Sequence, residues 1–151
     1  MGNKQNYQFS KVTQSTFDPK KYEGMWYKVH SSDVDDTSCD STVLFHFYTG
    51  EVLNITSYCI VKSRLVKHEQ KYATVPNKFE PCKFTIKSEG ILGTQSKYWI
   101  YYTDYVTYAL IGDGTMNKYG NGSNYVVLSR TPKVTKELTA KIQAEIIKHA
   151  I

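Results

Sequence analysis

Long hydrophobic runs are absent from the sequence. No stretch of its 151 residues approaches the ~20 apolar residues of a membrane-spanning helix. Residues 1–16 are polar and lack the apolar core of a secretion signal. We therefore expect no membrane-spanning helix. Two locations remain open: an intracellular protein or part of an assembly, or a secreted protein whose signal has already been removed.

Cysteine is scarce. The chain has three cysteines, Cys39, Cys59 and Cys82, an odd number that leaves at least one thiol unpaired within the chain. Cys59 and Cys82 can pair only if their strands come close, which the sequence does not decide. A reduced, intracellular state is the simpler interpretation.

Motifs for metals and membrane anchors are missing or incomplete. The four histidines are not spaced as metal ligands, so we predict no metal site and no cofactor. Met1-Gly2 begins an N-myristoylation pattern, but Asn6 stands where that pattern needs serine or threonine. We expect residues 1–16 to form a flexible arm and residues 17–151 to form a single domain.

Acidic residues are outnumbered, 14 against 19 lysines and arginines, which gives a net charge of +5. Such a balance can attract an anionic membrane surface, a protein assembly or a nucleic acid. The lysines, however, are scattered, mostly at alternate strand positions such as Lys83 and Lys87, which favours a solvated outer face. The sequence has no nucleic-acid-binding motif, so we expect no nucleic-acid partner.

What the sequence has in abundance is tyrosine and strand-like alternation. Thirteen tyrosines suit half-buried strands, and apolar residues alternate with polar ones, as in Leu53, Ile55 and Val61 against Asn54 and Thr56. Turn residues separate these runs. The pattern predicts eight strands in hairpin order, at residues 25–29, 42–48, 51–62, 64–75, 82–88, 97–105, 106–111 and 124–131.

The periodicity changes after Pro132. Leu138, Ile142 and Ile146 recur at every fourth residue, and Thr135 is a suitable N-cap. We expect an amphipathic helix that packs on the outside of the sheet. Many short strands followed by one helix are compatible with a β-barrel or a β-sandwich, and the pattern alone does not choose between them.

Three segments together resemble the lipocalin family. Gly24-Met25-Trp26, which follows residues 17–23, is similar to its first signature, residues 103–105 contain its Thr-Asp-Tyr, and Arg130 matches the arginine of its last strand. Within the family the chain is most similar to apolipoprotein D and the bacterial outer-membrane lipocalins, through residues 98–110 and 73–83.

The resemblance implies an all-β fold: an eight-stranded antiparallel up-and-down barrel with one C-terminal α-helix packed outside. It implies that Arg130 lies across the Trp26 indole at the closed end of the barrel, a structural cation–π contact. The long loop at residues 31–41 would cover the open end. The family's signature residues would then serve the fold, namely Gly24, Trp26, Thr103, Asp104, Tyr105 and Arg130.

Under this resemblance the barrel binds and carries a small hydrophobic or amphipathic molecule, such as a fatty acid, lipid, sterol, retinoid or pigment. A lining that mixes aliphatic side chains with tyrosine, histidine and Lys28 suits an acidic or hydroxyl head group. Each lining residue could instead be packed core. Alternation and the family match select His30, Leu53, Ile55, Cys59, Phe84, Tyr98, Ile100, Tyr102, Ile111, Val126 and Leu128 as ligand-binding candidates.

Two other functions remain open. Residues 39–43 and 53–57 resemble lipocalin-type prostaglandin D synthase, which would make Cys39 the nucleophile of an isomerase. Asp40 beside it would raise the pKa of the thiol, and the nearest base in the sequence is His46. The third function is a structural or docking component of a larger assembly, in which the barrel has no cargo.

Overall fold

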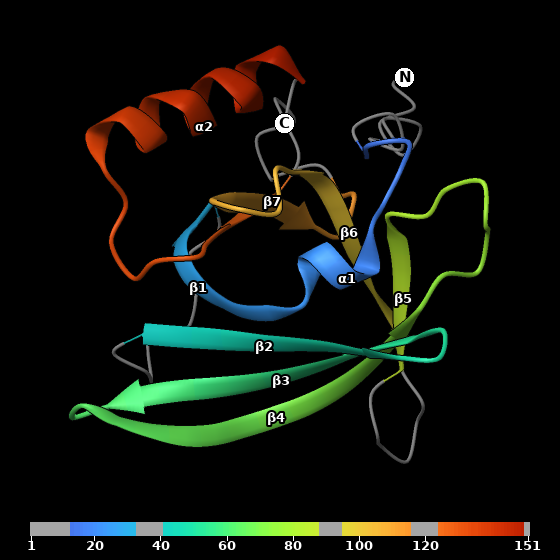
Figure 1. Ribbon diagram of the computed structural model, residues 1–151, viewed down its shortest axis with the longest axis horizontal. Helices are drawn as coiled ribbons and strands as arrows, with labels where there is room; N and C mark the ends of the chain where they lie inside the picture. Colours follow the sequence, from blue (N-terminus) through green and yellow to red (C-terminus); the bar gives the residue numbers. More distant parts are fainter. Residues whose placement is uncertain (1–12, 33–40, 88–94, 116–123, 150–151) are drawn as a thin grey trace, which may run out of the picture.

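The computed structural model describes residues 13–32, 41–87, 95–115 and 124–149, and its strands form one closed antiparallel barrel in chain order (Figure 1). This confirms the eight-stranded barrel with one C-terminal helix outside it. The strands are β1 (Gly24–Ser31), β2 (Ser41–Thr49), β3 (Val52–Val61), β4 (Arg64–Thr74), β5 (Lys83–Lys87), β6 (Gln95–Thr103), β7 (Tyr108–Gly112) and β8 (Val126–Ser129).

A short helix, α1 (Pro19–Tyr22), leads into β1. The Asp18 side chain accepts hydrogen bonds from the backbone N–H groups of Lys20 and Lys21, at 3.2 and 3.4 Å. Pro19 opens the helix, where its missing N–H leaves nothing unsatisfied. The helix ends at Tyr22, a fully buried residue that packs into the barrel interior against Trp26.

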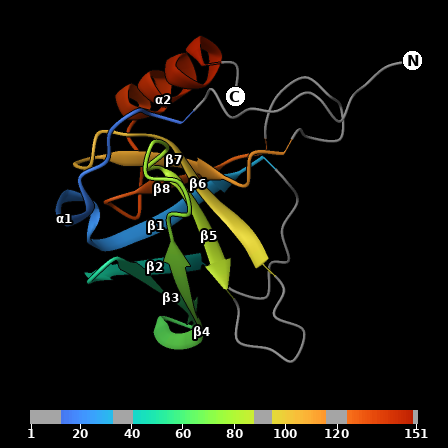
Figure 2. The ribbon, with the colours of Figure 1, turned by 90° about the vertical axis from the view of Figure 1, so that its right-hand side faces the viewer.

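The C-terminal helix, α2 (Lys136–Lys148), begins where the sequence predicts it. The Thr135 hydroxyl accepts a hydrogen bond from the Leu138 N–H at 3.1 Å, which caps the helix. Ile142 is buried on its barrel-facing side. In two perpendicular views the helix lies across the outside of the barrel, on the side opposite β2, β3 and β4 (Figures 1 and 2).

The buried residues form two cores, separated by the wall of the barrel. The helix-side core lies between α2 and the outer face of β6, β7 and β8, and contains Tyr101, Tyr108, Leu110, Val127 and Ile142. The interior core lies inside the barrel and includes Tyr22 and Trp26, at the end where α1 leads into β1. Its members are Tyr22, Trp26, Leu53, Ile55, Ala73, Cys82, Phe84, Ile86, Tyr98, Ile100, Ala109, Ile111 and Leu128.

The strand pairing has three irregularities. One adds a residue to β4 between Lys67 and Glu69, which pair with Tyr58 and Ser57. The other two change which of the predicted side chains face inward. The pairing of β1 with β8 shifts between Lys28 and His30, and the pairing of β6 with β7 shifts between Ile100 and Tyr102. A bulge adds one residue to one strand, so the two-residue alternation no longer holds across it. Inward positions predicted beyond these last two bulges are therefore wrong, as the placement of His30 and Tyr102 shows below.

The sequence predicts that one strand follows another directly at residue 106, and this is wrong. β6 ends at Thr103, and β7 begins at Tyr108. Asp104 holds the turn between them, because its Oδ1 accepts hydrogen bonds from the N–H groups of Val106, Thr107 and Tyr108. Burial alone would raise the pKa of Asp104, but these bonds and one from the Thr107 hydroxyl lower it on balance.

Within the described part of the chain, neither helix is long and apolar enough to cross a membrane.

Candidate functional site: the barrel interior

One end of the barrel is closed by Arg130 and Trp26. The guanidinium lies 3.7 Å from the centre of the indole ring. It also donates hydrogen bonds to the carbonyl oxygens of Tyr105, Met25 and Lys21, at 3.0, 3.0 and 2.9 Å. Arg130 thus joins the β6–β7 turn, β1 and α1. All of its bonds go to the protein backbone, so its role at this end is structural.

Next to this closed end, inside the barrel, three side chains form a hydrogen-bonded chain. The hydroxyl of Tyr98 lies 2.7 Å from the Tyr22 hydroxyl and 2.8 Å from Nε2 of His46. Tyr22 and His46 are fully buried and Tyr98 is nearly so. These two contacts pair both hydroxyls and Nε2 of His46, which is how buried polar groups are accommodated without water, while the buried Nδ1 of His46 has no hydrogen-bond partner among the described residues.

Burial sets the protonation of this chain. Burial, and after it the positive charge of Arg130, lower the pKa of His46 to about 3, although the Gly24 backbone acts in the opposite direction. Burial also raises the pKa of Tyr98 and, together with Tyr98, that of Tyr22. All three groups are therefore neutral at pH 7. They form an uncharged floor to the space above.

The open half of the barrel contains two adjoining spaces. The inner one has a volume of about 120 Å³ and is lined by Leu44, Ile55, Ile86 and Ser57. The outer one has about 350 Å³ and extends to Ile111, Val126 and the ends of β1, β7 and β8. Both are lined by Lys71, Ile86 and Tyr98. The outer volume alone lies at the lower end of the range for small-molecule sites.

A charged pair lines this space. Nζ of Lys71 lies 3.4 Å from Oε1 of Glu69, and the side chains of Lys71 and Glu69 are 34% and 45% exposed to solvent. Both residues lie on β4 on the same face as the buried Ala73, because their positions differ from it by two and four. The cavity therefore has aliphatic walls, a tyrosine hydroxyl and an ammonium group.

Sequence reasoning missed Glu69, Lys71 and Tyr22, and considered His46 only as a base for Cys39. The signal for the charged pair was present, since counting back by two from Ala73 reaches both positions. Because alternation was applied only to apolar residues, these inward charges were not selected.

Most of the predicted ligand-binding residues lie in or against the interior core. Leu53, Phe84, Ile100 and Leu128 are fully buried and form packed core. Ile55, Tyr98, Ile111 and Val126 line the open spaces. The predicted set therefore divides between residues that fill the closed half of the barrel and residues that a ligand in the open half would contact.

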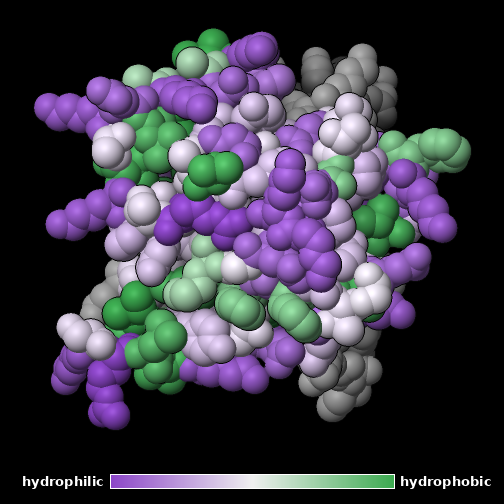
Figure 3. Space-filling view, viewed as in Figure 1, coloured by the Kyte–Doolittle hydropathy of each residue, from purple (hydrophilic) through white to green (hydrophobic). Residues whose placement is uncertain are grey.

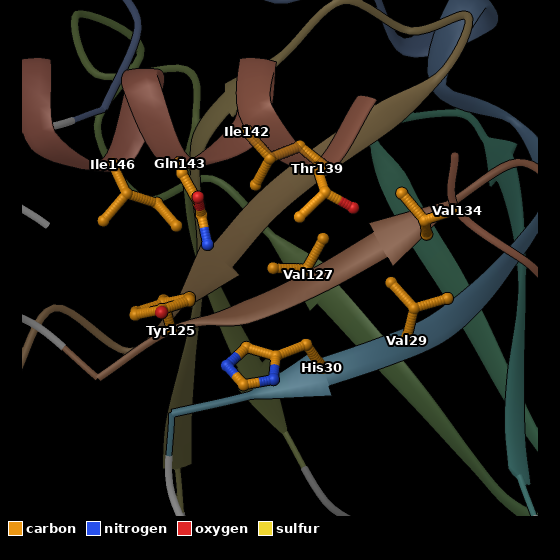
Figure 4. Close-up of a pocket in the computed structure, with 9 residues that line it drawn as sticks. All are labelled: Val29, His30, Tyr125, Val127, Val134, Thr139, Ile142, Gln143 and Ile146. Atoms are coloured by element: carbon orange, nitrogen blue, oxygen red, sulfur yellow. The ribbon is translucent and has the colours of Figure 1, made fainter. Parts of the chain in front are cut away.

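His30 and Tyr102 were expected inside, and the structure places both outside, beyond the two bulges. His30 is exposed and lies against Tyr125, in a groove of about 240 Å³ between α2 and the outer face of β1 and β8 (Figure 4). Tyr102 packs in the helix-side core, with ring contacts to Tyr108 and His149.

The cysteines also differ from the expectation of a reduced chain. Cys59 is disulfide-bonded, so the expected reduced state is wrong for this residue. Cys82 is a free, buried thiol whose pKa burial raises to about 12, so a Cys59–Cys82 bridge is not formed. Cys39, the candidate nucleophile, lies outside the described residues. The distance between two cysteines in the folded chain decides whether they pair, and their spacing along the sequence does not reveal that distance.

Among residues 13–32, 41–87, 95–115 and 124–149, no three potential metal-ligating side chains of histidine, cysteine, aspartate or glutamate come together.

Solved structures with the same architecture are numerous. The chain superimposes on apocrustacyanin C2 with a TM-score of 0.66 and 19% identity, over 99% of this chain and 80% of that one. Lobster apocrustacyanin A1 gives 0.64 and 20%, over 87% and 73% of the two chains. The major allergen Per a 4 from cockroaches gives 0.63 and 20%, over 91% and 84%.

No protein-family model and no curated protein matches the sequence. These neighbours do not support the apolipoprotein D-like subtype, so that part of the resemblance stays a prediction. The neighbours are lipocalins, and the barrel, the external helix and the order of the strands agree with theirs. The chain therefore has the lipocalin fold.

Proposed function

We propose that this protein is a lipocalin that binds and carries a small amphipathic molecule in the open half of its barrel, with an acidic head group at Lys71. The observation that carries the proposal is the pair of adjoining spaces lined by aliphatic side chains, Tyr98 and Lys71. Apolar walls with few polar groups are the usual composition of a small-molecule site.

The arrangement favours a chain-like ligand with one polar end. Leu44, Ile55 and Ile86 surround the inner space, and each methylene buried there contributes about 0.8 kcal/mol. The uncharged His46–Tyr98–Tyr22 floor offers no charge to a head group. A carboxylate is therefore better placed toward the mouth, where Lys71 is partly solvated and does not have to be fully desolvated.

Glu69 limits the strength of this contact but helps to position it. Its carboxylate holds Nζ of Lys71 near the cavity and cancels part of its charge. An acidic head group must therefore either bind the Lys71 ammonium together with the Glu69 carboxylate or displace that carboxylate. Because association and ordering also cost free energy, we expect micromolar binding of a long-chain fatty acid.

Replacing Lys71 with methionine is expected to weaken binding of a fatty acid about tenfold, because a partly exposed charge-assisted hydrogen bond is lost. Binding of the alcohol of equal chain length should change less than threefold. The measurement is displacement of a fluorescent fatty acid at low ionic strength. Lys87→Met is the matched control, because Lys87 is exposed on β5, where it pairs with Tyr72, the residue next to Lys71 on β4.

An equal loss in the Lys71 and Lys87 variants would contradict the head-group assignment but leave carriage intact. Loss of fatty acid and alcohol alike in the Lys71 variant would show that Lys71 supports the wall of the barrel and does not select the head group.

A further inference from the structure

The hairpin of β3 and β4 projects beyond the rest of the barrel. β5 pairs with β4 only at Tyr72, Ala73 and Thr74. From Arg64 to Lys71, the strand pairing that the structure describes for β4 is therefore with β3. The turn at Lys62 and Ser63, both with positive φ, closes the ribbon with two residues. The turn lies at the left end of β3 and β4 in Figure 1.

Both faces of this ribbon tip are apolar. Leu65 pairs with Ile60 and Val66 pairs with Cys59, so Leu65 and Val66 lie on opposite faces. Their exposed fractions are 54% and 52%, and that of Val61 is 37%. A partner protein with a flat surface, or one that packs the ribbon against its own core, would bury only one of the two faces. Burial of both faces requires surroundings that envelop the tip.

The charge at the tip is entirely positive. Lys62, Arg64 and Lys67 are exposed there, and residues 52–68 contain no acidic side chain. Figure 3 shows hydrophobic and hydrophilic side chains side by side at this end of β3 and β4. Apolar side chains flanked by lysine and arginine are the composition that binds the interface of an anionic bilayer.

We propose that the β3–β4 tip docks on a lipid bilayer that carries anionic head groups. Ile60, Val61, Leu65 and Val66 enter the interfacial region, and Lys62, Arg64 and Lys67 bind phosphates. A bilayer surrounds both faces of an inserted ribbon and supplies the opposite charge, which a one-sided partner does not.

The tip lies at the same end of the barrel as the mouth of the cavity. The turn follows the end of β3 that pairs with the start of β2, at Ile60 and Ser41. The end of β1 at Ser31 and the start of β8 at Val126 lie at this same end of the barrel, and both line the outer space. A docked tip would bring the mouth of the cavity near the membrane, where an amphipathic ligand is exchanged.

The test is flotation of the full chain with phosphatidylcholine vesicles that contain no or 30% phosphatidylserine. We expect binding to the anionic vesicles at least tenfold stronger, and loss of most of it in 0.5 M salt. Leu65→Ser with Val66→Ser should weaken it at least tenfold. Phe79→Ser is the control, because Phe79 is 93% exposed in the β4–β5 connection at the opposite end.

A charge series tests the same contact. The triple variant Lys62→Gln, Arg64→Gln and Lys67→Gln should bind anionic vesicles roughly 100-fold more weakly, because each cation near the surface contributes about fivefold. Lys133→Gln, Lys136→Gln and Lys148→Gln remove the same net charge from exposed positions at α2, on the other side of the barrel. That control should lose no more than a few-fold.

Leu65→Trp supplies a direct readout of insertion, since its fluorescence should shift to the blue with anionic vesicles. Equal losses in tip and control variants, equal binding to neutral vesicles, or an unshifted tryptophan would overturn the proposal. So would tip-dependent self-association in place of vesicle binding. Ligand titration without vesicles separates these outcomes from a failure of carriage.

Discussion

Replacing Trp26 with alanine is expected to lower the free energy of unfolding by about 3–5 kcal/mol, the range for removing a large aromatic side chain from a core. The indole is fully buried, and its ring centre lies 5.3 Å from that of Tyr22. Its Nε1 donates a hydrogen bond to the Tyr22 carbonyl at 3.0 Å. Truncation leaves a cavity and removes the surface on which Arg130 stacks.

The measurement is equilibrium unfolding in urea at pH 7, with Trp99→Ala as the matched control. Trp99 is half-buried on the outside of the barrel, where the ammonium groups of Lys83 and Lys97 lie over its ring. Its removal should destabilise the fold by about 1–2 kcal/mol, since it deletes less buried surface. Equal effects of the two substitutions would contradict the role of Trp26 as the centre of the closed end.

Acidification is expected to destabilise the fold strongly through His46. Its pKa is about 3 in the folded state against an ordinary value of 6.5. Between these values the unfolded chain binds a proton that the folded protein excludes, so stability falls as the pH falls. At about 1.4 kcal/mol per pH unit, the loss from this residue between pH 6.5 and 3.5 is about 4 kcal/mol. The pH dependence from this residue fades above pH 6.5, as the unfolded chain also loses its proton.

The His46 contribution is isolated by comparing urea unfolding of wild type and His46→Gln from pH 7 to pH 3.5. Glutamine removes the titration and can still bond to the Tyr98 hydroxyl. The variant should lose about 4 kcal/mol less than wild type over this range. His68→Gln, at an exposed position on β4, should follow wild type. Parallel curves for all three proteins would show that His46 is solvated or protonated in the folded state.

Features local to the chain could be predicted from the sequence. Alternation of apolar and polar residues located every strand, because each strand buries one face. The change to a four-residue period, with Thr135 as cap, located α2. The resemblance, and not the alternation, selected the barrel over a sandwich, and Arg130 lies on Trp26 as that resemblance implied.

Features that depend on neighbouring strands could not be predicted. The bulges before His30 and Tyr102 arise in the pairing of β1 with β8 and of β6 with β7. A single strand's pattern contains no sign of them. The Asp104 turn is likewise fixed by three N–H groups that follow it. Alternation assigned that stretch to strands.

The candidate site shows the same division. Ile55, Tyr98, Ile111 and Val126 were selected because they are apolar or aromatic and alternate inward, and each lines an open space. Alternation could not tell these from Leu53 or Phe84, which are packed core. Whether an inward residue meets a ligand or another side chain depends on how much of the barrel the core fills. Tyr22 and Trp26, which are distant in sequence from these residues, are fully buried and fill the closed end.

The most direct test of carriage is a fatty-acid titration of wild type against Ser57→Trp. Ser57 lines the inner space of about 120 Å³, and an indole there would fill that space while the lysine at position 71 is retained. Ser41→Trp, at the start of β2 and outside both spaces, is the control. We predict micromolar binding by wild type and Ser41→Trp and at least tenfold weaker binding by Ser57→Trp. Equal binding by all three, or none by folded wild type, would contradict the proposal that the barrel carries a ligand.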